Sequence, residues 1–186
     1  VDFRIVVNGY SVCGKLLCNL LSCFLLRKKK MIMETPVLNQ HNKLEHEQSH
    51  SCEHILNATM VRMFGCPRSR NAHIERKKSK CDYILDSEPS EDMVSQIENA
   101  VNEVIDRGLD VTVEYVGREQ AAAMVDLSKL PEDASETLRI VRIGDYDICA
   151  CIGAHVTNTS EIGTFRIISH SFADGVWRVR WKVTGK

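Results

Sequence analysis

Two helical patterns of apolar residues stand out along the chain. The first covers residues 42–65; its stretch 45–64 lacks glycine and proline, and Gly65 and Pro67 end it. The second begins after Ser90, a good N-cap residue, and ends at Gly108. Its apolar stripe is made of Met93, Ile97, Val101, Val104 and Ile105. The sequence therefore predicts two long helices in this part of the chain.

Strands are predicted where apolar residues recur at period two. The segments with this pattern are 81–85, 110–116, 138–143, 163–169 and 175–184. The last is the clearest, because Trp177, Val179, Trp181 and Val183 share one face while Val176, Arg178, Arg180 and Lys182 mostly share the other. A basic loop (66–80), a short helix (117–125) and a polar linker (128–137) complete the pattern. Helices and strands interleave without regular βαβ spacing, which indicates an α+β fold with a mixed or antiparallel sheet.

The first thirty residues differ from the rest. Residues 11–26 are apolar but interrupted by Lys15, and the run is shorter than the ~20 residues of a membrane-spanning helix. The basic run 27–30 follows it, whereas a signal peptide carries its basic residues first. We expect residues 1–41 to be an N-terminal extension outside a working domain of residues 42–186, so that deleting residues 1–30 leaves folding and activity intact.

Composition agrees with one ordinary domain and no membrane partner. The chain has 186 residues, 44% apolar and 26% charged. Its eight cysteines do not predict disulfides, because the chain is long, rich in helical pattern and without a convincing secretory signal. We therefore expect a reducing, cytoplasmic location; the oligomeric state stays open.

Charge is segregated although the net charge is only −1. Residues 62–80 hold seven basic side chains and one acidic, whereas residues 82–136 hold fifteen acidic and three basic. Such segregation can direct a polyanion to one face, although a solvated basic loop is the simpler interpretation.

Candidate chemistry lies in two short segments. In HSCEH (50–54), His50 and His54 are four residues apart and share a helix face, so both imidazoles can reach one ion. The HExxH metalloprotease signature is absent, because Ser51 follows His50. In CIGAH (151–155), a thiolate and an imidazole can converge on the same ion.

One cysteine and three histidines complete a tetrahedral zinc site, and the two pairs together favour this interpretation. The alternatives are a buried Cys151 with His155 on a loop, or a nucleophilic Cys149 or Cys151 paired with a histidine. The predicted zinc ligands, which are also the candidate catalytic residues, are His50, His54, Cys151 and His155.

Three segments together resemble a known family. HSCEHILNATMVRMFG (50–65), RIGDYDICA (142–150) and CIGAHVTNTSEIG (151–163) resemble the editing domain of alanyl-tRNA synthetase, its free-standing relatives and the editing domain of threonyl-tRNA synthetase. The resemblance covers residues 44–170. The family's second motif typically reads CGGTHVxNTGEIG, so this chain departs from it at Ile152, Ala154 and Ser160.

The resemblance implies hydrolysis of the aminoacyl ester of a mischarged tRNA by a zinc site. It also implies a small, trans-acting form, because the synthetase's catalytic and anticodon parts are absent from this sequence. The expected substrates are Ser-tRNA(Ala) and Gly-tRNA(Ala), with threonyl-type editing of Ser-tRNA(Thr) as an alternative. Two functions of a different kind also fit these residues. One is a non-catalytic module that binds tRNA or a partner, with its pocket blocked by Ile152 and Ala154, and the other is a hydrolase of unrelated small esters.

The resemblance also suggests residues for the two parts of the substrate. Contacts to the amino acid are expected from Ser69, Asn71, His73, Thr157 and Thr159, each of which can equally be an ordinary turn residue. Contacts to the tRNA acceptor end are expected from Arg68, Arg70, Arg76, Lys77 and Lys78, with Arg178, Arg180 and Lys182 as a second choice. Catalytic zinc usually keeps one coordination position open, and four protein ligands would close it. Either His155 or His54 would then be displaced or lie outside the coordination shell, or the metal would orient the substrate while a free water attacks.

Overall fold

A computed structural model describes residues 5–7, 10–12, 46–128, 130 and 134–185. The chain divides into two compact units, Val1–Thr35 and Pro36–Lys186. In the first unit, β1 (Ile5–Val7) pairs antiparallel with β2 (Tyr10–Val12). Most of the apolar segment 11–26 and the basic run 27–30 lie outside the described residues, and the proposed boundary at residue 41 stays a prediction. None of the described helices is long and apolar enough to cross a membrane.

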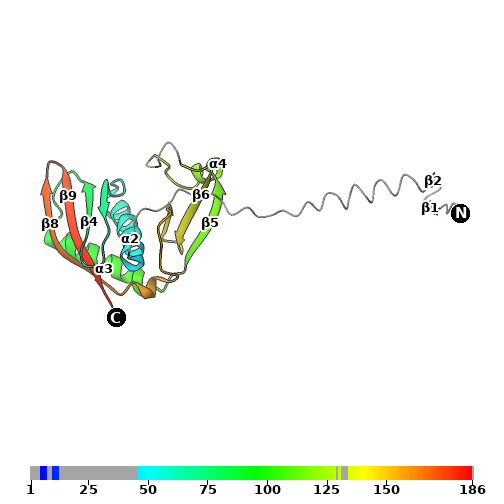
Figure 1. Cartoon of the computed structure of the whole chain (residues 1–186). Coiled ribbons are helices and arrows are strands. Elements are labelled where there is room, and N and C mark those ends of the chain that lie inside the picture. Colours follow the sequence, from blue (N-terminus) through cyan, green and yellow to red (C-terminus); the bar gives the residue numbers. More distant parts are fainter. Residues whose placement is uncertain (1–4, 8–9, 13–45, 129, 131–133, 186) are drawn as a thin grey trace. The chain divides into compact units, whose positions relative to one another are not determined.

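The second unit combines helices with two antiparallel sheets (Figure 1). Its helices are α2 (Glu47–Phe64), α3 (Glu91–Asp106), α4 (Arg118–Ala122) and the 3-10 helix η1 (Thr159–Glu161). Its strands are β3 (Asn71–His73), β4 (Ser79–Ile84), β5 (Val111–Gly117), β6 (Thr137–Ile143), β7 (Asp147–Ala150), β8 (Thr164–Ala173) and β9 (Val176–Thr184). The predicted α+β class is confirmed, and both sheets are antiparallel.

One sheet has the strand order β3-β4-β9-β8, the other β5-β6-β7. Helix α2 lies between them and contacts both β7 and β9 (Figure 1). It starts at His46, whose ring accepts from the Ser49 amide, and ends at Gly65, which adopts φ 63°. Because both sides of α2 are covered, every residue from Ser49 to Met60 is buried.

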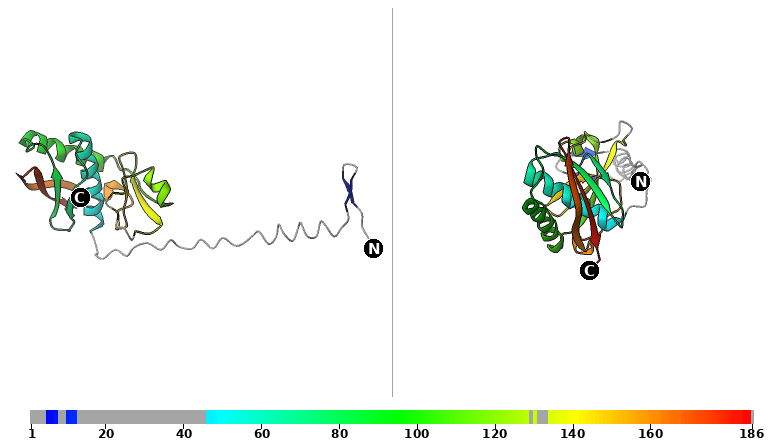
Figure 2. Two further views of the ribbon diagram at one scale, coloured as in Figure 1. Left: turned by 90° about the horizontal axis from the view of Figure 1, so that it is seen from above. Right: turned by 90° about the vertical axis from the view of Figure 1, so that its left-hand side faces the viewer.

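The core fills the space between the helices and the four-stranded sheet. On β9, Trp177, Val179 and Trp181 are fully buried, as the alternation in the sequence predicts. They join Tyr83 and Phe165 against the two long helices. The opposite face of this sheet carries the basic residues of β9 and faces away from α2 and α3 (Figure 2).

Two hairpins were not foreseen from periodicity. The predicted loop 66–80 contains β3 and the start of β4, which pair as a hairpin. All three residues of β3 are exposed, so no apolar alternation marks the strand. Strands β6 and β7 form the other hairpin, whose turn begins at Gly144 with φ 47°.

Candidate metal centre

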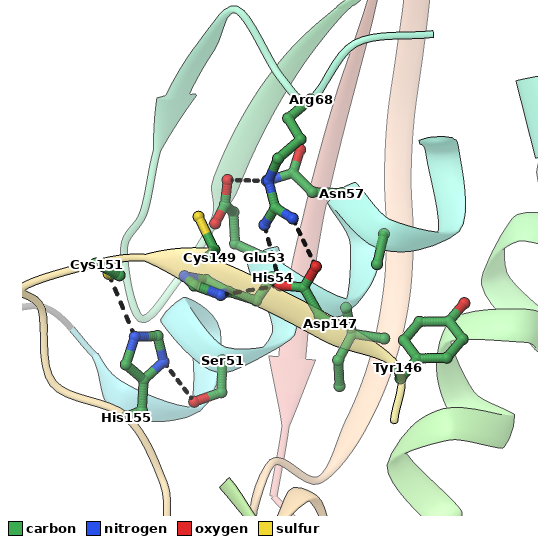
Figure 3. Close-up of polar contacts among 12 residues, drawn as sticks. Ser51, Glu53, His54, Asn57, Arg68, Tyr146, Asp147, Cys149, Cys151 and His155 are labelled. Carbon is green, nitrogen blue, oxygen red and sulfur yellow. Dashed lines mark hydrogen bonds and ion pairs between the residues drawn. The ribbon is translucent and has the colours of Figure 1, made fainter. Parts of the chain in front are cut away.

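The two predicted motifs meet at one point. The Cys151 sulfur lies 3.4 Å from His50 Nε2 and 3.4 Å from His155 Nε2. One ligand atom from each of His50, His54, Cys151 and His155 can be chosen so that all four lie within 4.8 Å of one another. These residues come from helix α2 and from the segment that follows β7 (Figure 3), so segments about a hundred residues apart build one cluster.

Local structure on each side explains this convergence. One turn of α2 separates His50 from His54, with ring centroids 5.3 Å apart. Cys151 continues the pairing of β7 with β6, because its amide donates to the Arg139 carbonyl at 3.0 Å. The Arg139 guanidinium in turn donates to the carbonyls of Cys151 and Gly153, each at 2.8 Å. Arg139 therefore stabilises the conformation of the loop between Cys151 and His155, a role that the sequence did not indicate.

Each imidazole has a partner on its outer nitrogen. His50 Nδ1 donates to the Ala154 carbonyl at 3.1 Å, and His54 Nδ1 donates to Asp147 Oδ2 at 3.2 Å. His155 Nδ1 forms a 3.1 Å hydrogen bond with Ser51 Oγ, as Figure 3 shows. Metal-binding histidines characteristically use their second nitrogen in this way, which fixes the ring orientation and the tautomer. The cluster therefore has the supporting contacts of a metal site as well as the donor set.

Asp147 is the most heavily supported of these partners. Its buried carboxylate accepts from His54 and also from the Arg68 guanidinium, at 2.6 and 3.2 Å (Figure 3). Burial alone would raise the Asp147 pKa, but the hydrogen bonds from His54 and Arg68 lower it below the ordinary value. Burial likewise opposes charge on His54, yet its contacts with Asp147 and Cys151 raise its pKa. Asp147 is therefore a fixed negative charge behind His54.

The cysteine at the centre is held as a thiolate. Burial would raise the Cys151 pKa, but hydrogen bonds from His155, His50 and His54 lower it well below the usual range. Burial lowers the pKa of His155 to about 4, so this imidazole is neutral at pH 7. By contrast, burial raises the pKa of Cys149, which stays a thiol. A thiolate beside imidazole nitrogens is a donor set that suits zinc.

A cavity of about 430 Å³ opens beside the cluster. His50, His54 and Cys151 form part of its wall. The rest of the wall consists of Glu53, Asn57, Pro67, Arg68, Ser69, Ala72, His73, Ile74, Val125, Asp126, Leu130, Ile148, Cys149 and Ala150. A small polar molecule, or the end of a larger one, can therefore reach the cluster from this side.

Buried polar groups organise the cavity wall. Asn57 donates to Glu53 Oε1, and its own oxygen accepts from the Ser69 amide at 2.8 Å and from the Tyr83 hydroxyl at 3.1 Å. This network anchors the loop after α2 to the helix. Glu53 and Asn57 were not singled out from the sequence, although both are polar residues of α2 within one turn of His54.

The predicted amino-acid contacts fall into two groups. Ser69 and His73 line the cavity, where the Ser69 hydroxyl donates to the Asn71 carbonyl and His73 Nε2 lies 2.8 Å from Glu75. Asn71, Thr157 and Thr159 are not among the residues that line it. Thr157 is exposed and donates to Glu161, whereas Thr159 is fully buried beside the end of α3. Their roles toward a substrate stay predictions.

The residues predicted to contact the tRNA acceptor end also fall into two groups, those in ion pairs and those exposed on the surface. Arg68 is in the ion pair with Asp147, behind the cluster. Arg70 and the turn residues Arg76, Lys77 and Lys78 are exposed on or beside the β3–β4 hairpin. Of the second group, Arg178 makes two 2.7 Å contacts with Asp82 on the neighbouring strand.

Comparisons with known proteins point in the same direction as this geometry. Residues 138–180 match the family model of the threonyl and alanyl tRNA synthetase second additional domain. The chain is 30% identical over 151 residues to alanine–tRNA ligases of Staphylococcus aureus, for example those of strains JH9 and Newman. That alignment covers 80% of this chain but only 17% of each ligase. The chain belongs to the family of domains related to the editing domain of alanyl-tRNA synthetase.

Proposed function

We propose that this protein hydrolyses the ester between an amino acid and the terminal ribose of a mischarged tRNA, and that it acts in trans. The observation that carries the proposal is the convergence of three imidazoles and a thiolate in one cluster, of which His50, His54 and Cys151 line a 430 Å³ cavity. The reaction consumes water and releases a free amino acid and a tRNA with a free terminal hydroxyl. Such a protein would work where tRNA is charged, in the cytoplasm.

The relatives suggest the tRNA but do not fix it. The similar ligases act on alanine and its tRNA, as their name states, and this chain spans only 17% of their length. We therefore propose tRNA(Ala) carrying serine or glycine as the substrate, with Ser-tRNA(Thr) as the competing choice. A hydrophobic pocket separates amino acids that differ by one methylene by only ~1–3 kcal/mol, so polar contacts must contribute to selection. Ser69 and His73 line the cavity, and we propose that they provide such contacts.

His50, His54, Cys151 and His155 would hold a zinc ion. When bound, zinc polarises a carbonyl oxygen or lowers the pKa of a water. The surrounding residues perform the positioning: Asp147 keeps His54 turned inward, Ser51 keeps His155 turned inward, and Arg139 fixes the loop between Cys151 and His155. The buried wall formed by Glu53 and Asn57 would orient the amino acid relative to these groups.

Two residues motivated the non-catalytic hypothesis, in which the same domain only binds tRNA or a partner. Ile152 and Ala154 replace smaller or polar family residues, and in that hypothesis they obstruct the pocket. Neither lines the cavity, and Ile152 is 41% exposed. The geometry therefore provides no steric block and favours hydrolysis over binding alone.

Deacylation assays test the proposal. The full chain is incubated with Ser-tRNA(Ala), Gly-tRNA(Ala), Ser-tRNA(Thr) and correctly charged Ala-tRNA(Ala). We expect loss of the serine or glycine ester from tRNA(Ala) with Ala-tRNA(Ala) spared, and no turnover in Cys151→Ala. The matched control is Cys66→Ala, because Cys66 is another free cysteine that lies outside the cluster. Binding of tRNA without turnover on any of these substrates would contradict the proposal.

A further inference from the structure

The outer face of the four-stranded sheet carries a strip of basic residues. The strip consists of Arg76, Lys77, Lys78, Lys80, Arg180 and Lys182. The first three are exposed in the β3–β4 turn, and the others lie on β4 and β9 with partly or fully exposed side chains. In the part of the chain that the structure describes, none of these six forms an ion pair.

The register of the sheet places like charges side by side. Lys80 is directly opposite Arg180, and neither side chain has an ion pair in the described residues. Lys182 is directly opposite Arg166 on β8, but Arg166 is paired with Glu98 at 2.6 Å. Like charges in such positions destabilise a sheet, because their side chains are only about 5 Å apart. The next pair along the same face is neutralised, since Asp82 faces Arg178. The strip therefore retains a local repulsion that a bound polyanion would relieve.

The strip begins beside residues that line the cavity. His73 on β3 is directly opposite Lys80, and Ala72, His73 and Ile74 all line the cavity. The basic turn, which begins at Arg76, follows Ile74 after the single acidic residue Glu75. Neither α2 nor α3 lies on this face of the sheet, as the right-hand view of Figure 2 shows. A rod-like polyanion lying along the strip would thus end at the cavity.

We propose that the strip binds the phosphate backbone of an RNA duplex, the acceptor stem of the substrate tRNA. The single-stranded 3′ end would then pass β3 and place the ester at the metal centre. This assignment rests on the proposed function and extends it by naming the surface that holds the RNA. Lysine and arginine contacts to phosphates provide affinity without base specificity, so the strip would accept stems of different sequence.

The test measures binding separately from catalysis. The full chain is titrated with an uncharged RNA hairpin that has an acceptor-stem duplex and a single-stranded 3′ end, at several salt concentrations. The variant is Lys80→Gln with Arg180→Gln, which keeps the aliphatic stems of both side chains. The matched control, Arg107→Gln with Arg118→Gln, removes the same charge near α3 and α4. Deacylation of Ser-tRNA(Ala) at saturating RNA is measured for all three proteins.

We expect the strip variant to bind RNA about tenfold more weakly than the wild type. The slope of log binding constant against log salt concentration should become less steep by about two, because two phosphate contacts are lost. The control should match the wild type in RNA affinity, salt dependence and turnover. Wild-type affinity and salt slope in the strip variant would overturn the assignment, even if hydrolysis is observed. Conversely, weakened RNA binding without hydrolysis by any protein would support the strip and contradict the proposed function. Loss of binding to anionic lipid vesicles, with RNA binding intact, would reassign the strip and overturn it as an RNA surface.

Discussion

Helices α2 and α3 have similar lengths, 18 and 16 residues, but their buried residues differ in polarity. The five buried residues of α3 are all apolar, whereas seven of the twelve buried residues of α2 are polar. Buried polar groups cost free energy unless they are hydrogen-bonded, and those of α2 are connected to one another and to the loops. The contrast indicates that α3 contributes mainly stability and that α2 contributes mainly a site. Substitutions in the two helices should therefore have separable effects.

The largest effect should come from His54→Ala on α2. Removing this ligand should lower deacylation by at least about a thousandfold, equivalent to about 4 kcal/mol of transition-state stabilisation. His170→Ala on β8 is the control, because His170 lies outside the cluster. Steady-state rates on Ser-tRNA(Ala) measure the difference. Equal rates in the two variants would show that α2 does not carry the site.

Ile97→Ala on α3 should have the reverse effect. Ile97 is fully buried in the core, so its truncation should lower the free energy of unfolding by about 2–5 kcal/mol. Activity per folded molecule should not change, because α3 contributes no residue to the cluster or to the cavity. Urea denaturation measures the loss of stability. Deacylation rates at low temperature, where the variant stays folded, measure the activity per folded molecule. A loss of turnover in fully folded protein would contradict it.

Asp147→Asn should lower zinc affinity by about 10–100-fold, since partners of this kind orient metal ligands. Competition with a chelator measures the affinity. Asp145→Asn is a matched control, because its carboxylate is exposed and pairs with Arg107 rather than with a histidine. An unchanged affinity in Asp147→Asn would mean that His54 is held in place by other contacts.

The smallest effect should come from the outer sheet face. The Arg178 guanidinium holds the pKa of buried Asp82 below its ordinary value. A lowered carboxyl pKa contributes stability above the unfolded-state pKa of about 4, and this contribution is lost as pH falls through the folded-state value. Arg178→Gln should therefore lower the free energy of unfolding only slightly at pH 7, because solvent screens the exposed Arg178 guanidinium, and the difference from wild type should shrink below pH 4. Urea denaturation at several pH values tests this, and a difference that grows on acidification would be inconsistent with it.

Spacing in the sequence was sufficient to predict the four members of the cluster. His50 and His54 are linked by one helical turn, and Cys151 and His155 by a short loop, so each pair is a local feature. The supporting residues could not be predicted, because the contact between Arg68 and Asp147 joins positions 79 residues apart and neither stands out from other charged residues. Thr159 illustrates the opposite case: it lies in a polar stretch but is fully buried, tying η1 to the end of α3.

Zinc content measured on the purified full chain tests the central claim most directly. Wild type, Cys151→Ala and Cys66→Ala are dialysed against trace zinc, and bound metal is quantified per chain by mass spectrometry. We expect one zinc per chain in the wild type and in Cys66→Ala, and strongly reduced zinc in Cys151→Ala. The reason is that Cys151 belongs to the cluster and Cys66 does not. Equal zinc content in all three proteins would contradict the account.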